Sequence, residues 1–346
     1  IVNKISIYNR ALGVSPSGYY RITQYLSSLQ SKNKIKNIAP VNFYSWYISI
    51  KGNKYINILL SPILYVTMLT RLTFFLLYDL IIFKPDYIII SRGLLPRILP
   101  FWIKKIISNI KSSLFWDFDD DITLSKEISE SEFDLLCNIS SKIIVTHNYL
   151  KNKIPNNFRK KVHILPTTDG DFERLDFSKI IQVRYTSFKS EINIVWTGTA
   201  GNLINVRRVL PCLDYAAEKI MKSQNKRVIL NILCNKLLDD HTNFLIIKNI
   251  KWSQQSAIKQ ISSSHIGIMP LDNNEYALGK GGFKLIQYMA ASLPIIGSEV
   301  GYNSEIIDDS NGILIKNNED EKEWLEALEY IISNWQDYIY FSQNSR

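Results

Sequence analysis

Short apolar runs alternate along the chain with stretches in which apolar residues recur every three to four positions. The short runs predict strands at 4–10, 86–91, 113–118, 142–146 and 161–166, and then at 192–198, 227–234, 246–250, 265–271, 293–298 and 312–316. The longer period predicts helices at 18–30, 56–78, 96–110 and 129–139, and then at 203–221, 254–262, 281–291, 302–307 and 319–334. Apolar strands that alternate with helices are typical of parallel sheets covered by helices on both faces.

The alternation weakens at 167–191, which is polar and aperiodic. We therefore expect an α/β protein with two doubly wound, Rossmann-like domains that face each other across a cleft. The predicted division is 1–170 for the first domain, 171–191 for a linker and 192–330 for the second domain. A last helix within 331–346 is expected to return to the first domain. The length of 346 residues fits two domains.

The most apolar region lies at 55–83, where Ser61-Pro62, Arg71 and Asp79 interrupt it. Its longest uncharged run is shorter than the roughly 20 residues that a spanning helix needs. We expect a buried or interfacial helix there, either in the core or at a membrane surface.

The cysteines and the first residues of the sequence give an indication of the cellular compartment. Cys137, Cys212 and Cys234 are odd in number and widely spaced, which predicts neither a disulfide framework nor a metal site. The start, "IVNKISIYNR", lacks the pattern of a signal peptide. We therefore expect a cytoplasmic protein.

Charge is distributed unevenly around the net value of +9. Residues 1–115 hold fifteen lysines and arginines against two acids, Asp79 and Asp86, and contain no glutamate. A bias of the composition toward lysine does not explain why glutamate is absent from this half. We therefore expect this half to face an anionic surface. The surface could be membrane lipid or nucleic acid. Because the aromatic residues at 43–47 and 74–78 are interpreted as core residues, we expect no nucleic acid partner.

Glycine-rich turns follow two predicted strands of the second half. Gly198 ends the strand predicted at 192–198, Thr199 follows it, and Arg207 lies on the next helix; either an anion or a plain surface turn explains them. After 265–271 comes "GKGGFKLIQYM" at 279–289, where glycines and lysines open a helix. Lysine in a first turn is favourable if an anion lies there, so this segment predicts phosphate binding.

Polar residues also follow the strands of the first half. Ser17, Gly18 and Arg21 form a candidate anion loop, and Arg92 follows the strand at 86–91. The strand at 113–118 runs into "WDFDDD", with Asp117 and three further aspartates in four residues. Such a cluster indicates a metal site, a general base or hydrogen bonds to sugar hydroxyls.

Three of these segments together resemble glycosyltransferase family 4. The strongest similarity covers "HIGIMPLDNNEYALGKGGFKLIQYMAASLPIIGSEVGYNSEI" at 265–306, and weaker similarity covers "WDFDD" at 116–120 and "SPSGYYRITQYLSSL" at 15–29. The resemblance implies the GT-B fold and retaining transfer from a nucleotide-diphosphate sugar, with no cofactor and no metal. It also implies an acceptor that is a lipid-linked glycan or polysaccharide, used at the anionic inner face of the plasma membrane by a peripheral protein.

The resemblance also assigns roles to residues. The donor-binding set is Gly198, Thr199, Arg207, Lys280, Gly281, Gly282, Phe283, Lys284, Gln287 and Glu305. The catalytic set is Asp117, Asp119 and Asp120, and the acceptor or phosphate loop comprises Ser17, Gly18, Arg21 and Arg92. Many relatives carry two glutamates eight positions apart, where this chain has Gly279 and Gln287. Gln287 could still bind a ribose, whereas Glu305 could equally cap its own helix.

Two other functions fit parts of the sequence. A metal-dependent transferase would use Asp117 and Asp119 as a DxD site, but it leaves the segment 279–289 unexplained. A non-catalytic nucleotide-sugar-binding protein at the membrane would explain the missing pair of acids.

Overall fold

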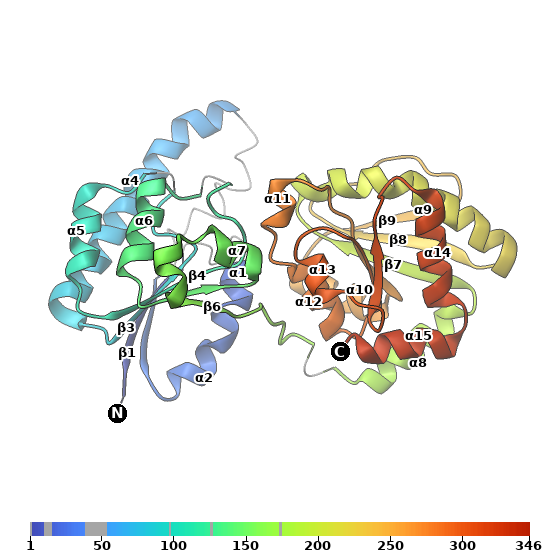
Figure 1. Ribbon diagram of the computed structural model, residues 1–346, viewed down its shortest axis with the longest axis horizontal. Helices are drawn as coiled ribbons and strands as arrows, with labels where there is room; N and C mark the ends of the chain where they lie inside the picture. Colours follow the sequence, from blue (N-terminus) through green and yellow to red (C-terminus); the bar gives the residue numbers. More distant parts are fainter. Residues whose placement is uncertain (1, 10–15, 39–53, 97, 125–126, 173–174) are drawn as a thin grey trace. The chain divides into compact units, whose positions relative to one another are not determined.

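The computed structural model describes residues 2–9, 16–38, 54–96, 98–124, 127–172 and 175–346 (Figure 1). The chain divides into two compact units. The first comprises Ile1–Thr167 with Gly279–Gly281, and the second comprises Thr168–Leu278 and Gly282–Arg346. Each unit contains a six-stranded sheet with flanking helices, so the predicted pair of Rossmann-like domains is confirmed.

The sheet of the first unit has the order β2-β1-β3-β4-β5-β6, with parallel pairing throughout. Its strands are β1 (Lys4–Asn9), β2 (Lys34–Ile38), β3 (Tyr87–Ser91), β4 (Ser113–Phe118), β5 (Lys142–Val145) and β6 (Val162–Ile164). The sequence analysis missed β2. This edge strand reads KIKNI and is only partly covered, so it lacks the apolar run that marks the central strands.

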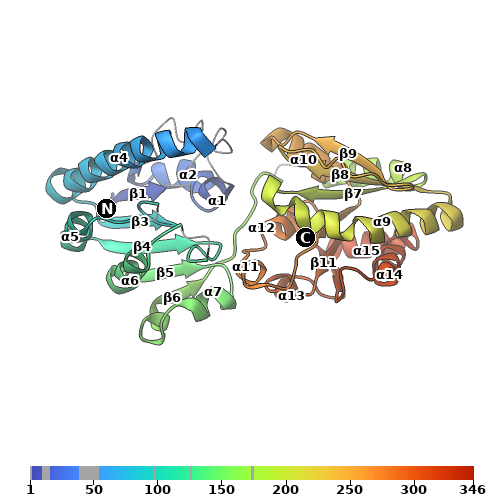
Figure 2. The same cartoon turned by 90° about the horizontal axis from the view of Figure 1, so that it is seen from above.

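Short and long helices cover this sheet (Figures 1 and 2). They are α1 (Pro16–Tyr20), α2 (Leu26–Gln30), α4 (Lys54–Tyr78), α5 (Phe101–Asn109), α6 (Glu130–Ile139) and α7 (Asn148–Lys153). The single helix predicted at 18–30 is instead α1, a 3₁₀ turn at Thr23–Tyr25 and α2.

Helix α4 is the crossover between β2 and β3, and it continues as a π-helical turn at Asp79–Phe83. One face packs into the core through Leu64, Met68, Leu72 and Leu76. Asp79 is fully buried and accepts hydrogen bonds from Ser6 Oγ (3.0 Å) and Tyr8 Oη (2.5 Å), and it pairs with Lys36. The end of the apolar helix is thereby attached to β1 and β2.

The aromatic residues at 74–78 do not all lie in the core as predicted. Phe74 is 63% exposed, whereas its neighbour Phe75 packs against the core of the first unit. The aromatic residues at 43–47 lie outside the described residues.

The sheet of the second unit has the order β12-β11-β10-β7-β8-β9, again with parallel pairing. Its strands are β7 (Glu191–Thr197), β8 (Arg227–Leu233), β9 (Ile246–Ile250), β10 (Ile266–Met269), β11 (Ile295–Ser298) and β12 (Gly312–Ile315). Its helices are α8 (Phe177–Phe188), α9 (Leu203–Gln224), α10 (Gln254–Ser263), α11 (Glu275–Leu278), α12 (Phe283–Ala290), α13 (Asn303–Ile306), α14 (Glu321–Ile332) and α15 (Trp335–Asn344).

The segment 171–191, predicted as a linker, contains α8 and belongs to the second unit. The helical period of this segment was hard to recognise because one of the two residues that α8 buries, Arg184, is charged, whereas the other is Phe188. Arg184 is fully buried and donates to the carbonyls of Ser262 (2.9 Å), Ser292 (2.7 Å) and Ala291 (2.7 Å). These carbonyls close the ends of α10 and α12, so Arg184 joins three helices.

The last residues, 331–346, were expected to return to the first domain, but they lie in the second unit as the end of α14 and α15. Tyr338 and Phe341 are buried in its core. Ser342 Oγ donates to the Ser292 carbonyl at 2.7 Å, and Ser345 Oγ donates to the Asn311 carbonyl at 3.0 Å. A core position of Tyr338 and Phe341 explains why this segment stays with the second unit.

We predict that Arg184→Met lowers the free energy of unfolding by about 3 kcal/mol or more, because three buried carbonyls lose a charged donor. Urea denaturation measures this change. Val183→Ala is the control, since Val183 is 54% exposed on the same helix. Equal stability of Arg184→Met and wild type would contradict a structural role for α8.

Candidate active site

In each sheet the strand order reverses between two neighbours, and the loops that follow them leave in opposite directions. The reversal lies between β1 and β3 in the first unit and between β7 and β10 in the second. Ligands of doubly wound sheets bind at such points, beyond the carboxyl ends of the strands. The candidate residues of each unit are therefore described around its own reversal point.

Two predicted donor-binding segments meet at the reversal point of the second unit. Gly198 follows β7, and Lys284 lies in the first turn of α12 after β10. A Cβ atom on Gly198 would come within 3.1 Å of Lys284 Cε and 2.6 Å of the Trp196 ring. Lys284 Nζ lies 5.7 Å from the centroid of that ring. Only glycine fits beside Trp196, and the close approach brings the lysine over the end of β7.

The start of α12 depends on a glycine conformation. Gly282 is the N-cap residue with φ of 63°, and Phe283 is the first helical residue. A helix N-terminus attracts anions through its N–H groups and its dipole. Thr199, by contrast, is exposed, and its hydroxyl accepts a hydrogen bond from Asn202 Nδ2 at 3.0 Å.

Gln287 lies one turn further along α12 and has an acidic partner that the sequence analysis missed. Gln287 Nε2 donates to Asp169 Oδ2 at 3.0 Å, and both side chains are buried. Burial raises the pKa of Asp169 to about 6, although hydrogen bonds from the Asp171 N–H and from Gln287 oppose this shift. Asp169 lies inside the stretch interpreted as a linker, and the acidic turn "DGD" at 169–171 was its only signal.

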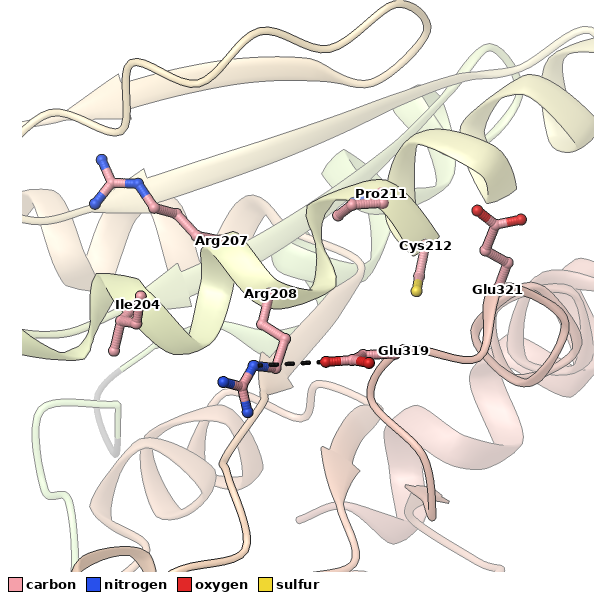
Figure 3. A pocket seen from close by; sticks show the side chains of 7 residues that line it. All are labelled: Ile204, Arg207, Arg208, Pro211, Cys212, Glu319 and Glu321. Atoms are coloured by element: carbon pink, nitrogen blue, oxygen red, sulfur yellow. Dashed lines mark ion pairs between the residues drawn. The ribbon is translucent and has the colours of Figure 1, made fainter.

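The two arginines of α9 have different surroundings (Figure 3). Arg207, predicted to bind the donor, pairs with Asp240 (2.8 Å) and Asp239 (3.1 Å) of the loop after β8. Arg208 instead pairs with Asp272 (2.6 Å), which follows β10. The second arginine is therefore the one directed toward the reversal point.

A hollow of about 440 Å³ opens beside these arginines (Figure 3). It is lined by Ile204, Arg207, Arg208, Pro211, Cys212, Glu319 and Glu321. Both guanidinium groups already pair with carboxylates, so the hollow does not offer an uncompensated charge to a phosphate.

Glu305, another predicted donor-binding residue, is exposed on α13. This short helix is held by Asn303, whose Nδ2 donates to the carbonyls of Met269 (3.2 Å) and Ser298 (3.0 Å). The carbonyls belong to the last residues of β10 and β11, which places Glu305 at the same edge of the sheet.

In the first unit, Arg21 and Asp117 form a buried ion pair. Arg21 Nε donates to both carboxylate oxygens of Asp117, at 3.0 and 2.9 Å. Its Nη1 donates to the Leu165 carbonyl (3.1 Å) and to Thr167 Oγ1 (3.0 Å). Asp117 is thereby fixed by a bidentate cation, an arrangement that stabilises position more than it supplies reactivity.

A second ion-pair cluster joins the ends of β3 and β4. Arg92 Nη1 lies 2.5 Å from Asp119 Oδ1, while its other nitrogens bind both oxygens of Glu127 at 2.9 and 2.7 Å. Ser17 Oγ donates to Asp119 at 2.8 Å. The predicted residues Ser17, Arg92 and Asp119 are thus brought together.

Gly18 lies inside α1, in agreement with the helix predicted from residue 18, and its carbonyl accepts a hydrogen bond from Asn9 Nδ2 (3.1 Å). Residues 10–15 of the same candidate loop lie outside the described residues.

The pKa values of two neighbouring carboxylates in the cluster are shifted in opposite directions. Burial raises the pKa of Asp119 despite Arg92 beside it. Burial also acts on Asp120, but Lys280, Arg92 and the Gly281 N–H outweigh it and lower its pKa. Within the first unit, Lys280 Nζ lies 3.9 Å from Asp120, and the Gly281 N–H donates to Asp120 at 3.1 Å. Lys280 and Gly281, predicted to bind the donor, therefore also neutralise an acid of the cluster.

The negative charge of two aspartates in the run is balanced by arginine side chains, so their carboxylates are not left to bind a metal ion. Asp117 faces Arg21 and Asp119 faces Arg92, so both DxD carboxylates already have a cationic partner. Within the described ranges, no three histidine, cysteine or acidic residues group in a way that could hold a metal ion. Asp121 caps the following turn, with its carboxylate accepting from the Thr123 N–H at 3.0 Å.

His147 is a further residue that the sequence analysis did not assign. It is buried directly after β5, and its Nδ1 lies 2.9 Å from Thr146 Oγ1, which in turn donates to the Asp119 carbonyl at 3.1 Å. Its place after a strand of the same sheet was the signal that could have identified it.

Part of the chain matches a known protein family. Residues 195–334 match the sequence model of a family described as glycosyl transferases, group 1. This range contains Gly198, α12 and Gln287. No curated protein matches the chain.

Solved structures with the same fold cover nearly the whole chain. Anabaena HepE in complex with UDP and glucose has 10% identity and a TM-score of 0.62, over 99% of this chain and 93% of that chain. Sucrose-phosphate synthase from Thermosynechococcus elongatus has 11% identity and a TM-score of 0.64, over 99% and 93%. UDP-GlcNAc 2-epimerase from Methanocaldococcus jannaschii has 13% identity and a TM-score of 0.58, over 99% and 97%. At these identities the likeness shows the fold alone.

The chain thus has the fold of these solved structures, and its residues 195–334 match the glycosyl transferase group 1 model.

We predict that Gly282→Ala weakens the start of α12. The positive φ of 63° costs about 1 kcal/mol for alanine, and a Cβ would lie 2.8 Å from the Tyr302 ring. Thermal denaturation should show a loss of about 1 to 3 kcal/mol in the free energy of unfolding. Gly201→Ala is the matched control because its Cβ would meet nothing within 4 Å. Equal effects of the two substitutions would show that Gly282 is not conformationally required.

Proposed function

We propose that the protein transfers a sugar, with retention of configuration, from a nucleoside-diphosphate sugar to a lipid-linked glycan in cell-surface glycan assembly, as glycosyltransferase family 4 members do. The observation that carries this proposal is the reversal point of the second unit. Gly198, Lys284 and the pair of Gln287 and Asp169 all lie on elements that meet there.

The diphosphate is assigned to the turn that opens α12. Gly282 begins the helix, Lys284 supplies a point charge close to the end of β7, and an N-terminal helix turn favours an anion. These groups would stabilise the negative charge that develops on the leaving diphosphate, so the proposed reaction assigns no role to a cofactor. Because HepE was solved with UDP and glucose, UDP-glucose is the first donor to test.

The nucleotide ribose is assigned to Gln287 and Asp169. A carboxylate with two oxygens can accept hydrogen bonds from two vicinal hydroxyl groups, and the amide of Gln287 holds it in place at 3.0 Å. Asp169 would thereby supply the acid that the position of Gln287 lacks. This carboxylate lies in the segment before α8, whereas Gln287 lies on α12.

The acceptor is assigned to the ion-pair cluster of the first unit. Asp119 has a raised pKa and lies against Arg92 and Ser17, which suits a group that accepts a hydrogen bond or a proton from a sugar hydroxyl. Asp120 would orient a second hydroxyl. Asp117 is fixed by Arg21 and would position the strand end instead of reacting.

A non-catalytic nucleotide-sugar-binding protein is the second candidate function. Gly279 stands where many relatives have an acid near the transferred sugar, which favours this alternative. Donor binding without transfer to lipid-linked acceptors, measured beside an active relative, would support it over the enzyme.

We predict that Lys284→Ala lowers the affinity for UDP-glucose about tenfold, because it removes a charge from the phosphate end, and that the double variant with Lys280→Ala lowers it further, because Lys280 lies two residues before the N-cap residue of α12. Isothermal titration calorimetry measures both. Lys222→Ala is the matched control, since its side chain is 65% exposed at the far end of α9. Unchanged affinity of the double variant, across a panel of nucleotide sugars, would refute the donor site.

The ribose assignment predicts a dependence on pH. Because the pKa of Asp169 is about 6, its carboxylate is mostly protonated at pH 5 and mostly ionised at pH 7.5. If the ionised form binds the ribose, affinity for UDP-glucose rises about tenfold over this range. The profile should be flat in Asp169→Asn.

A second readout concerns the free protein. The folded pKa of Asp169 lies above the value of an unfolded chain, so the folded state holds the proton more tightly. Stability should therefore fall as pH rises from about 4 to about 6, and Asp169→Asn should remove this part of the decline.

For the donor-affinity experiment, an identical pH profile in wild type and Asp169→Asn would rule out Asp169 as a ribose ligand.

A further inference from the structure

Helix α4 has a second apolar face, opposite the one that packs on the sheet. The residues of this face are large, hydrophobic and between 39% and 83% exposed: Tyr55, Leu59, Ile63, Val66, Phe74 and Leu77, with Ile81 in the π-helical turn. Their spacing of three, four or eight residues places them in one stripe along the helix. We call these seven residues the α4 stripe.

The start of α5 extends the exposed apolar surface. Tyr65 Oη donates to the Ile98 carbonyl at 2.9 Å, which holds α4 beside the segment that leads into α5. Ile98, Phe101 and Trp102 are 65%, 75% and 43% exposed. Both helices lie at the outside of the first unit (Figure 2). Contiguous apolar surface of this extent on a water-soluble domain marks a docking site.

The α4 stripe is not explained by a transmembrane helix. Residues 58–83 are long and apolar enough to cross a membrane, and only 22% of the most apolar window is buried. The opposite face of the same helix, however, packs on the first unit's core through Leu64 and Leu76, and Asp79 is tied to β1 and β2. A helix attached along its length to a sheet can lie on a bilayer but cannot leave the domain to span it.

The charged residues near the α4 stripe indicate which kind of partner surface it could bind. α4 and α5 contain no aspartate or glutamate, and Asp79 at the end of α4 is buried in its ion pair. Arg71, Lys84 and Lys105 are exposed, and Lys104 is half-buried beside Lys105. An apolar stripe on helices that carry exposed cations and no acid is complementary to an anionic lipid surface, although Asp86 is exposed two residues after Lys84.

We propose that the α4 stripe and the start of α5 form a monotopic docking surface for an anionic lipid bilayer, with α4 lying in the plane of the interface. The apolar side chains enter the headgroup region, and the lysines contact lipid phosphates. This surface would keep the protein peripheral at the cytoplasmic face of the membrane, where a lipid-linked acceptor would be found. The proposal does not depend on the donor site, because vesicle binding requires no nucleotide.

The test is co-sedimentation with phosphatidylcholine vesicles that either contain or lack phosphatidylglycerol. Wild type should bind the anionic vesicles, and added salt should weaken binding. Ile63→Ser with Phe74→Ser should reduce the partition coefficient about thirtyfold or more, because two large apolar side chains no longer enter the interface. Lys104→Ala with Lys105→Ala should reduce binding to anionic vesicles about tenfold.

The matched control is Leu237→Ser with Tyr330→Ser, which removes two exposed apolar side chains (67% and 62%) of the second unit and should bind vesicles as wild type does. Urea denaturation and UDP-glucose affinity confirm that each variant is folded; lost nucleotide binding with intact vesicle binding would overturn the proposed function alone. Equal loss of vesicle binding in the control would overturn the docking surface. A dimer in sedimentation velocity that the stripe variant dissociates, with no vesicle binding by wild type, would also overturn it and assign the stripe to a second copy of the chain.

Discussion

Parallel pairing of the strands is the constraint on which the site depends. Each parallel pair needs a crossover connection, and the crossovers bring the carboxyl ends of neighbouring strands to one edge of the sheet. Ser17, Arg92 and Asp119 are far apart in sequence yet meet at such an edge. Gly198 and Lys284 meet in the same way in the second unit. The strand order, more than any single residue, assembles the candidate chemistry.

Charge compensation shapes the first unit's cluster. Each buried carboxylate there must be offset by a cation or a donor, since an unpaired buried charge is costly. Arg21 offsets Asp117, and Arg92 is shared by Asp119 and Glu127. The same arginines that stabilise the strand ends thereby limit what the aspartates can do, and they favour hydrogen bonding to hydroxyl groups over the coordination of a cation.

Helix α4 has two apolar faces, one that packs in the core and one that is exposed. Its inner face supplies the core of the first unit, and Asp79 fixes its end through Ser6, Tyr8 and Lys36. Its outer face is apolar as well, which a soluble crossover helix does not require. The first 115 residues are basic as well, so the charge of this part of the chain and the outer stripe would both suit the docking surface proposed for α4.

The sequence by itself determined the two α/β domains and most central strands, because buried parallel strands such as β3 and β10 are continuously apolar. It also located the turn at Gly282 and the aspartate run. Only the tertiary structure showed that α8 is part of the second unit, since its buried face depends on Arg184 reaching carbonyls about 80 to 110 residues away. The partnership of Asp169 with Gln287, and of Arg92 with Glu127, likewise depends on contacts between distant segments, which no local pattern of residues encodes.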